Sequence, residues 1–327
     1  MTHAISNESE AVTAAVRPGA GALGLPAADL DNVLSGLLDA DAVVMGLPFD
    51  AGVAGVPGQR HGPEIFRNLA PVHDWILDER GGLGGMIDPA TRRSVLEGSR
   101  VFDLGDLGTV PIDPRMDRVA YYRTLTALAR KLAGAATIPL FVGGDHSLSA
   151  PIAAGVSERH GPLNFVCFDA HCDFNARPMP EVGDITHADF VGHLLQTGAI
   201  RDAEIYGVRT YLPAACGPLP GALRCAYDFD APAFGEHDAP TYLSVDLDVI
   251  DPADFPATGH PEAGGYRLRE LLSAVEHVCR TRRVVAVDIV EALQDDRENR
   301  ATAATISALV MTCLRALLEN DQETVTT

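Results

Sequence analysis

Short apolar runs that alternate with longer helical stretches are the feature that most constrains the fold of this 327-residue chain. We predict strands over residues 42–46, 101–104, 138–142, 163–168, 204–208, 242–247 and 284–290. Helices are predicted over residues 63–69, 117–132, 148–159, 188–196, 268–279 and 301–318. Because strands and helices alternate and the strands are apolar nearly throughout, we expect an α/β domain whose parallel sheet is covered on both faces.

A single domain preceded by an arm is the predicted organisation. Residues 1–28 are rich in Ala, Gly, Ser and Glu without periodicity, which is typical of a mobile arm or a subunit-contact extension. Residues 29–327 contain no repeat, low-complexity tract or linker that would divide them, so we expect one catalytic domain there.

Charge and cysteine content narrow the classes of partner and compartment. The formal net charge of −20 argues against a nucleic-acid partner, because phosphate binding requires clustered Lys and Arg. We find no apolar run of about 20 residues that would span a membrane, and residues 1–10 do not resemble a secretory signal. The six scattered cysteines form no CxxC pair, which fits a reduced, cytoplasmic protein.

Residues with metal-binding chemistry follow four of the predicted strands. In open α/β sheets, ligands bind outside the carboxyl ends of the strands. If the chain stays extended there, Asp169, His171 and Asp173 share one face, and Asp246 and Asp248 do the same. Taken alone, each segment is also compatible with a polar strand end or a helix cap. The four segments are residues 143–147, 169–173, 246–248 and 288–291.

Together these segments predict a site for two divalent cations. They bring four carboxylates and two imidazoles to neighbouring strand ends, and four positive charges would balance the four negative ones. Oxygen-rich ligation with two histidines favours Mn²⁺ over a structural zinc ion. We expect Cys172 to line the site and not to bind metal. The predicted ligands are His146, Asp169, His171, Asp173, Asp246 and Asp248.

Three strings in this chain resemble the signatures of the ureohydrolase family, which contains the arginases and agmatinases. They are GGDHS at 143–147, DAHCD at 169–173 and DLDVIDPADFPATG at 246–259. GLPFD at 46–50 and PGQRHGP at 57–63 also match the first strand and loop of that family. The resemblance runs from Val43 to the last helix and implies an arginase-like, three-layer α/β/α fold with a central, mainly parallel sheet.

The resemblance further implies a binuclear manganese centre that hydrolyses a guanidino group to urea and an amine. A hydroxide that bridges the two ions would be the nucleophile. The family usually forms trimers or hexamers, so a homo-oligomer is expected. By position, His146, Asp169, Asp173 and Asp246 would hold one Mn²⁺, and His171, Asp169, Asp246 and Asp248 would hold the other.

Two further residues are candidates for catalysis. Glu291 can pair a planar guanidinium through two hydrogen bonds, although a strand-end surface glutamate is the alternative. His187 lies in the loop where the family keeps a histidine suited to proton transfer to the departing amine. A histidine at a helix start is its alternative reading.

Departures from the family pattern fall on the loops that would contact the rest of the substrate. Ala188 replaces a usual glycine, and His260 stands where threonine is usual. Asn175 occupies a position that helps arginases to bind the amino-acid end of their substrate, but its usual serine and asparagine companions have no clear match. We therefore expect a modified, longer or peptide-borne guanidine instead of plain L-arginine, with Asn175 and His260 as candidate substrate contacts.

Two other functions remain open from the sequence. One is hydrolysis of an amide or formimino group at a related metal site. Deacetylases of this general fold hold a single zinc ion, so a metal count near one per chain would favour a deacetylase. The other is a metal-stabilised binding protein that has lost turnover, which the altered loops would allow.

Overall fold

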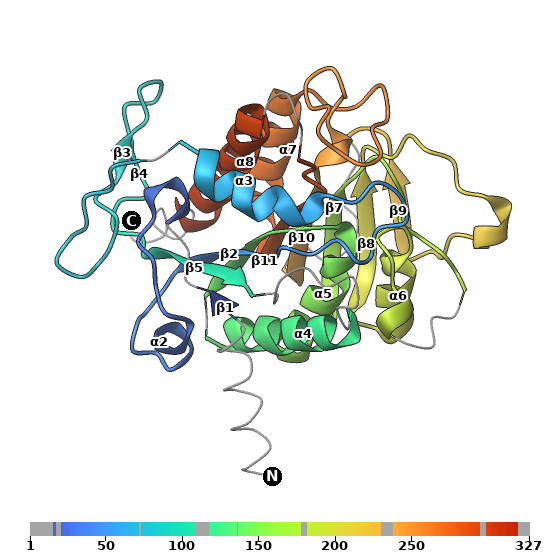
Figure 1. Ribbon diagram of the computed structural model, residues 1–327, viewed down its shortest axis with the longest axis horizontal. Helices are drawn as coiled ribbons and strands as arrows, with labels where there is room; N and C mark the ends of the chain where they lie inside the picture. The colour runs from blue at the N-terminus through green and yellow to red at the C-terminus, as the bar shows by residue number, and fades with distance from the viewer. Residues whose placement is uncertain are drawn as a thin grey trace, which may run out of the picture.

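A nine-stranded sheet runs through the middle of the computed structural model, which describes residues 16–17, 21–71, 73–108, 118–135, 137–177, 182–229, 238–294 and 299–319 (Figure 1). The strand order is β1-β5-β2-β6-β11-β10-β7-β8-β9. β1 pairs antiparallel with β5, and the other pairs are parallel, so the predicted mainly parallel sheet is confirmed. The strands are β1 (Val16–Arg17), β2 (Ala42–Gly46), β5 (Val101–Leu107), β6 (Ile138–Val142), β7 (Leu163–Phe168), β8 (Ile200–Tyr206), β9 (Leu223–Ala226), β10 (Pro240–Asp246) and β11 (Arg283–Val290).

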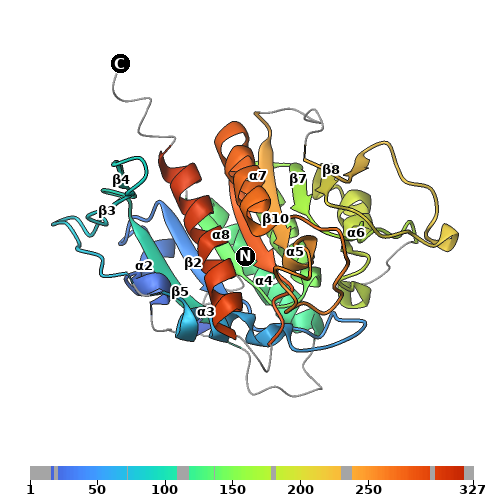
Figure 2. The ribbon, with the colours of Figure 1, turned by 90° about the horizontal axis from the view of Figure 1, so that it is seen from above.

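Helices cover both faces of this sheet, as the two perpendicular views show (Figures 1 and 2). One face carries α2 (Leu30–Leu34), α4 (Arg118–Gly134), α5 (Ser149–His160) and α6 (Phe190–Thr197). The other carries α3 (Gly62–Leu69), α7 (Leu268–Thr281) and α8 (Asn299–Glu319). The three-layer α/β/α fold is therefore confirmed.

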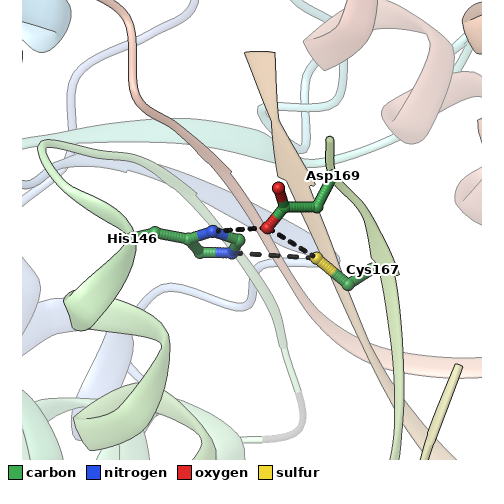
Figure 3. A group of neighbouring side chains, drawn as sticks. All are labelled: His146, Cys167 and Asp169. Atoms are coloured by element: carbon green, nitrogen blue, oxygen red, sulfur yellow. Dashed lines mark hydrogen bonds and ion pairs between the residues drawn. The ribbon is translucent and has the colours of Figure 1, made fainter. Parts of the chain in front are cut away.

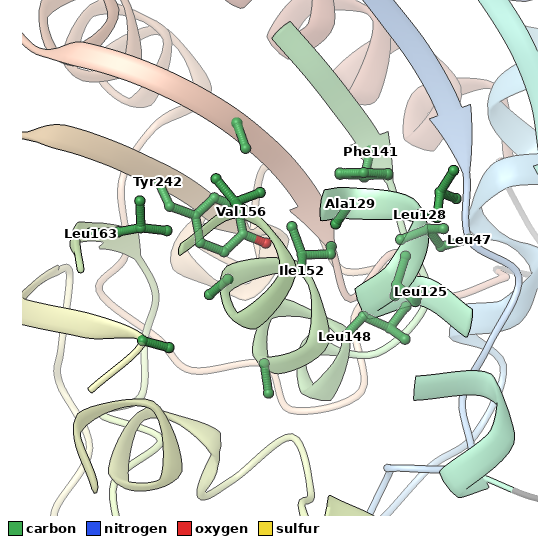
Figure 4. Packing of buried hydrophobic residues seen from close by; sticks show 14 of the residues in the cluster. Leu47, Leu125, Leu128, Ala129, Phe141, Leu148, Ile152, Val156, Leu163 and Tyr242 are labelled. Atoms are coloured by element: carbon green, nitrogen blue, oxygen red, sulfur yellow. The ribbon is translucent and has the colours of Figure 1, made fainter. Parts of the chain in front are cut away.

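Apolar side chains fill the space between the layers. On the α4 and α5 side, Leu125 and Ile152 from the helices meet Phe141 and Tyr242 from the sheet (Figure 4). On the other side, α8 packs against α3 and α7. By length and composition α8 could span a membrane, but 67% of its most apolar window is buried inside the protein. This burial is typical of a core helix.

Short elements account for most of the differences from the predicted secondary structure. β1, β9, α2 and the hairpin of β3 (Met86–Ile87) and β4 (Ser94–Val95) were not predicted, because runs of two to five residues show no clear period. Within the predicted arm, Ala22 and Leu23 are buried in the core. Residues 1–15 and 18–20 of that arm lie outside the described residues.

The strand order explains how segments far apart in the sequence meet. β6, β11, β10 and β7 are neighbours in the centre of the sheet, and they run parallel to one another. Their carboxyl ends therefore lie side by side at one edge. The segments 143–147 and 169–173 directly follow β6 and β7, whereas Asp246 ends β10 and the segment 288–291 spans the end of β11.

A buried ion-pair network fastens α3 to β5 and gives a test of the fold. The Arg67 side chain is 6% exposed. It donates to both carboxylate oxygens of Asp103, with distances of 3.1 and 2.9 Å, and also pairs with Asp106. Removing one partner of a buried pair leaves an uncompensated charge, so Arg67→Ala should lower the free energy of unfolding by about 3–5 kcal/mol. Urea denaturation with an unchanged m-value would measure the loss.

Arg100→Ala is the matched control. Arg100 pairs with Asp39 and Asp41, but its side chain is 32% exposed. Exposed pairs contribute about 0–1 kcal/mol, so this variant should unfold almost like the parent chain. Equal losses in the two variants would contradict the role given to the α3–β5 network.

Candidate metal centre

Two aspartates turn the chain sharply where their strands end. Asp169 Oδ1 accepts a hydrogen bond from the His171 N–H at 2.6 Å, and Asp246 Oδ1 accepts one from the Asp248 N–H at 2.8 Å. β7 thus ends before Asp169, and a φ of 44° at Asp173 turns the chain further. The predicted extended alternation of side chains is therefore wrong at both strand ends. Asx turns bring the side chains together instead.

The first group of ligand-type atoms surrounds His146, which begins the short helix η3 (His146–Leu148). His146 Nδ1 lies 3.1 Å from Asp169 Oδ2, 3.2 Å from Asp173 Oδ2 and 3.0 Å from Asp246 Oδ2. This nitrogen is buried, yet it has no hydrogen-bond partner among the described residues. The other ring nitrogen, Nε2, lies 2.9 Å from Ser244 Oγ, which fixes the ring with Nδ1 toward the carboxylates.

The second group forms around His171. His171 Nδ1 lies 2.9 Å from Asp248 Oδ2 and 3.5 Å from Asp169 Oδ1. Asp169 thus presents Oδ2 to the first group and Oδ1 to the second. Arg209 anchors the Asp248 side of the centre by donating to the Asp248 backbone carbonyl at 2.7 Å. The structure places all six predicted ligand residues in two adjacent groups that share Asp169.

The donor set fits divalent cations. Asp169, Asp173, Asp246 and Asp248 are each at most 9% exposed. Burial and the charges of Asp248 and Asp169 raise the pKa of Asp246 well above its ordinary value. Burial and the Asp169 charge raise the pKa of Asp173 to about 7. Such a buried cluster needs positive charge, and carboxylates with two imidazoles suit Mn²⁺.

Cys167 lies beside the first group and was missed by the sequence reasoning (Figure 3). Its Sγ is 3.8 Å from His146 Nε2 and 4.0 Å from Asp169 Oδ2. However, it approaches Nε2 of His146, whereas the three carboxylates approach Nδ1. Burial also raises the pKa of the Cys167 thiol well above its ordinary value, which disfavours the thiolate that a metal requires. We therefore regard Cys167 as a wall residue.

Glu291 is held ionised at the edge of the centre. Its backbone φ is 64°, and the side chain is nearly fully buried. Oε1 accepts a hydrogen bond from the His146 N–H at 2.9 Å, and Oε2 accepts one from Gln59 Nε2 at 2.9 Å. Burial raises the pKa of Glu291, but the hydrogen bond to His187 and the charge of His187 lower it by more, so the net change is a decrease. Gln59 lies in the upstream string at 57–63, for which the sequence had suggested no role.

His187 lies next to this carboxylate. Its Nδ1 is 3.3 Å from Glu291 Oε1, and its Nε2 accepts a hydrogen bond from the Ala54 N–H at 3.1 Å. Because Nε2 is an acceptor, Nδ1 carries the proton of the neutral ring. Burial lowers the pKa of His187, but the hydrogen bond to Glu291 and the charge of Glu291 give a net increase.

The two candidate substrate contacts differ in their surroundings. The His260 ring lies 5.0 Å from the His187 ring and 6.1 Å from the His171 ring, so it borders both parts of the site. Gly55 passes so close that a Cβ there would be 2.7 Å from His260 Nε2. Asn175 is buried, and its side-chain oxygen accepts a hydrogen bond from the Arg177 N–H within its own loop.

Known proteins resemble this chain over most of its length. The profile of the Arginase family matches residues 40–217 and 225–315, which include every candidate ligand. The N(1)-aminopropylagmatine ureohydrolase of Thermococcus kodakarensis is 29% identical, with 84% of this chain and 90% of the relative covered. The guanidinopropionase of Pseudomonas aeruginosa is 30% identical, with 85% and 86% covered. The structure of proclavaminate amidino hydrolase from Streptomyces clavuligerus matches with a TM-score of 0.70 at 25% identity, covering 93% and 98%.

Proposed function

Because this chain belongs to the arginase family of C–N hydrolases, we propose that it cleaves a guanidino group to urea and an amine with two manganese ions. The observation that carries the proposal is the pair of ligand groups that share Asp169. Relatives named for ureohydrolase, guanidinopropionase and amidinohydrolase activities support the same reaction class.

The proposed division of the ligands between two ions follows the two groups of side chains. When bound, the two cations would supply a nucleophilic hydroxide from water at neutral pH. Asp169 reaches both groups and would serve both ions, and the resemblance to the family assigns Asp246 to both as well. We assign His146, Asp169, Asp173 and Asp246 to one ion, and His171, Asp169, Asp246 and Asp248 to the other.

Glu291 and His187 would orient the substrate and move a proton. Glu291 is fixed from two sides by the His146 N–H and Gln59, so its carboxylate is positioned to pair with a guanidinium. A guanidine nitrogen bound to Glu291 comes next to the Nδ1 proton of His187. The raised pKa of His187 favours the protonated ring, which can deliver the Nδ1 proton to the departing amine and return to the neutral form.

His260 is the candidate for recognition of the remainder of the substrate. Its ring borders His187, and burial together with the positive charge of His187 lowers its pKa, which favours a neutral ring. A neutral imidazole can accept a hydrogen bond from the substrate. We propose that this residue and the Asn175 loop select a modified, longer or peptide-borne guanidine.

A urea-release screen tests the proposed reaction. The purified chain is loaded with Mn²⁺ and offered arginine, agmatine, guanidino acids, arginine-containing peptides, and formimino and acetyl amides. We expect urea and an equimolar amine from at least one guanidine, two manganese ions per chain and no reaction after chelation. Ammonia released only from formimino compounds, or amine released only from acetyl amides, would replace the proposal with the alternative reaction class.

We also propose that the protein works in the cytoplasm as a homo-oligomer, a trimer or hexamer. The six cysteines are free thiols in the structure, which supports a reducing compartment. The mass from light scattering would test the assembly.

A further inference from the structure

Two thiols lie in contact next to the candidate metal ligands. Cys172 Sγ and Cys225 Sγ are 3.2 Å apart. Cys172 is 3% exposed, whereas Cys225 is only half-buried on β9, at the edge of the sheet (Figure 1). An oxidant from solution can therefore reach the pair from the Cys225 side. Cys279 and Cys313 also contact each other, but both are buried between α7 and α8.

Cys172 is coupled to the metal centre through the backbone. It stands between His171 and Asp173, which belong to the two different ligand groups. Hydrogen bonds hold the turn on both sides of Cys172. On one side the Arg209 N–H donates to the Ala170 carbonyl, and on the other the Val191 N–H donates to the Asp173 carbonyl. Any displacement of Cys172 therefore acts on both neighbouring ligands.

We propose that Cys172 and Cys225 form an oxidisable dithiol site, whose disulfide weakens metal binding. The inference rests on the proposed function, because it assumes that His171 and Asp173 hold ions. The co-reactant is a peroxide, which reacts in two steps.

In the first step, the Cys225 sulfur attacks a peroxide oxygen. An S–O bond forms, the O–O bond breaks, and hydroxide leaves and combines with the thiol proton as water. In the second step, the Cys172 sulfur attacks the Cys225 sulfenic acid. The S–S bond forms, the S–O bond breaks, and the second water leaves with the Cys172 proton. Two thiols are oxidised by two electrons, and one peroxide is reduced to two waters.

The disulfide requires movement at the ligands. Disulfide sulfurs lie about 2.05 Å apart, so the two sulfurs must approach by about 1 Å from their present 3.2 Å. In a well-formed site, metal–ligand distances stay within about 0.2 Å of their usual values. Even if Cys225 and β9 move more than Cys172 does, any movement of Cys172 shifts its neighbours His171 and Asp173. Because disturbing the support of metal ligands typically costs 10–100-fold in affinity, the Kd for Mn²⁺ should rise about tenfold or more.

The test compares reduced and peroxide-treated full-length protein. Mn²⁺ binding is measured by titration calorimetry, free thiols are counted, and peptide mass spectrometry locates the disulfide. We expect loss of two thiols per chain, a linked Cys172–Cys225 peptide, and weaker Mn²⁺ binding that dithiothreitol reverses. Cys225→Ser should bind Mn²⁺ equally before and after peroxide. Cys216→Ser, which changes a half-buried thiol outside the pair, should respond like the parent chain.

Each contrary result has a distinct meaning. A reduced chain that binds no Mn²⁺ would overturn both the proposed function and this inference. Normal Mn²⁺ binding with no Cys172–Cys225 disulfide after peroxide, or with a disulfide but unchanged affinity, would overturn the inference alone.

Discussion

Asp246→Asn is expected to slow urea release by about three orders of magnitude or more and to leave fewer than two manganese ions per chain. Asp246 Oδ2 lies 3.0 Å from His146 Nδ1, while Oδ1 holds the turn that positions Asp248. Asparagine keeps the shape and can keep the turn, but it removes one negative charge. Metal ions supply several kcal/mol of transition-state stabilisation, and each 1.36 kcal/mol is tenfold in rate. We therefore expect kcat/KM to fall by about 10³-fold or more.

Metal content and thermal stability check this result without an activity assay. Elemental analysis after desalting gives the number of ions per chain. Saturating Mn²⁺ should raise the Tm of the parent protein, because a ligand at 100 times its Kd adds about 2.7 kcal/mol of stability. The rise should be smaller for Asp246→Asn.

Asp254→Asn is the control for this variant. Asp254 lies in the same sequence string, but its carboxylate is 29% exposed and pairs with Arg267 at 2.8 Å. This variant should keep two ions and the parental rate. Two tightly bound ions and normal turnover in Asp246→Asn would refute the ligand assignment.

The sequence predicted which residues meet in the candidate centre because strand ends are easy to recognise in an α/β chain. β2, β6 and β7 have the predicted bounds, since each is an apolar run bordered by polar or turn-forming residues. Parallel pairing then places the residues after β6, β7 and β10 at one edge. His146, Asp169 and Asp246 therefore meet at this edge.

Local geometry could not be predicted in the same way. The period of an extended strand implied a shared face for Asp169 and His171, whereas a side-chain hydrogen bond to the backbone turns the chain at Asp169. Ser244 lies two residues before Asp246 on β10, and that spacing alone could have suggested its contact with His146. Gln59 comes from a loop whose path only the tertiary structure fixes.

The identity of the substrate is harder to predict from the sequence than the fold or the candidate metal ligands. The guanidino end would meet residues that strand ends and buried charge hold in place. The rest of the substrate would meet loops such as the segments around Gly55 and His260, whose positions depend on mutual packing. No periodicity in the sequence encodes such packing.

His187→Ala is expected to lower kcat by about 10²–10⁴-fold, the usual contribution of a positioned general acid or base. His187 Nδ1 lies 3.3 Å from Glu291 Oε1, where the guanidinium would be held. None of the ion pairs of the two ligand groups involves His187. Its removal should therefore spare metal binding, and the variant should retain two manganese ions with KM changed far less than kcat.

Imidazole in the assay buffer distinguishes a chemical role from a structural one. The alanine variant leaves space for a small base beside Glu291, so added imidazole should restore part of the lost rate. His193→Ala, which removes a half-buried histidine from α6, should keep the parental rate and show no imidazole effect. Loss of manganese from His187→Ala would show that the wrong histidine has been assigned to proton transfer, because a residue outside both ligand groups has no reason to affect metal content.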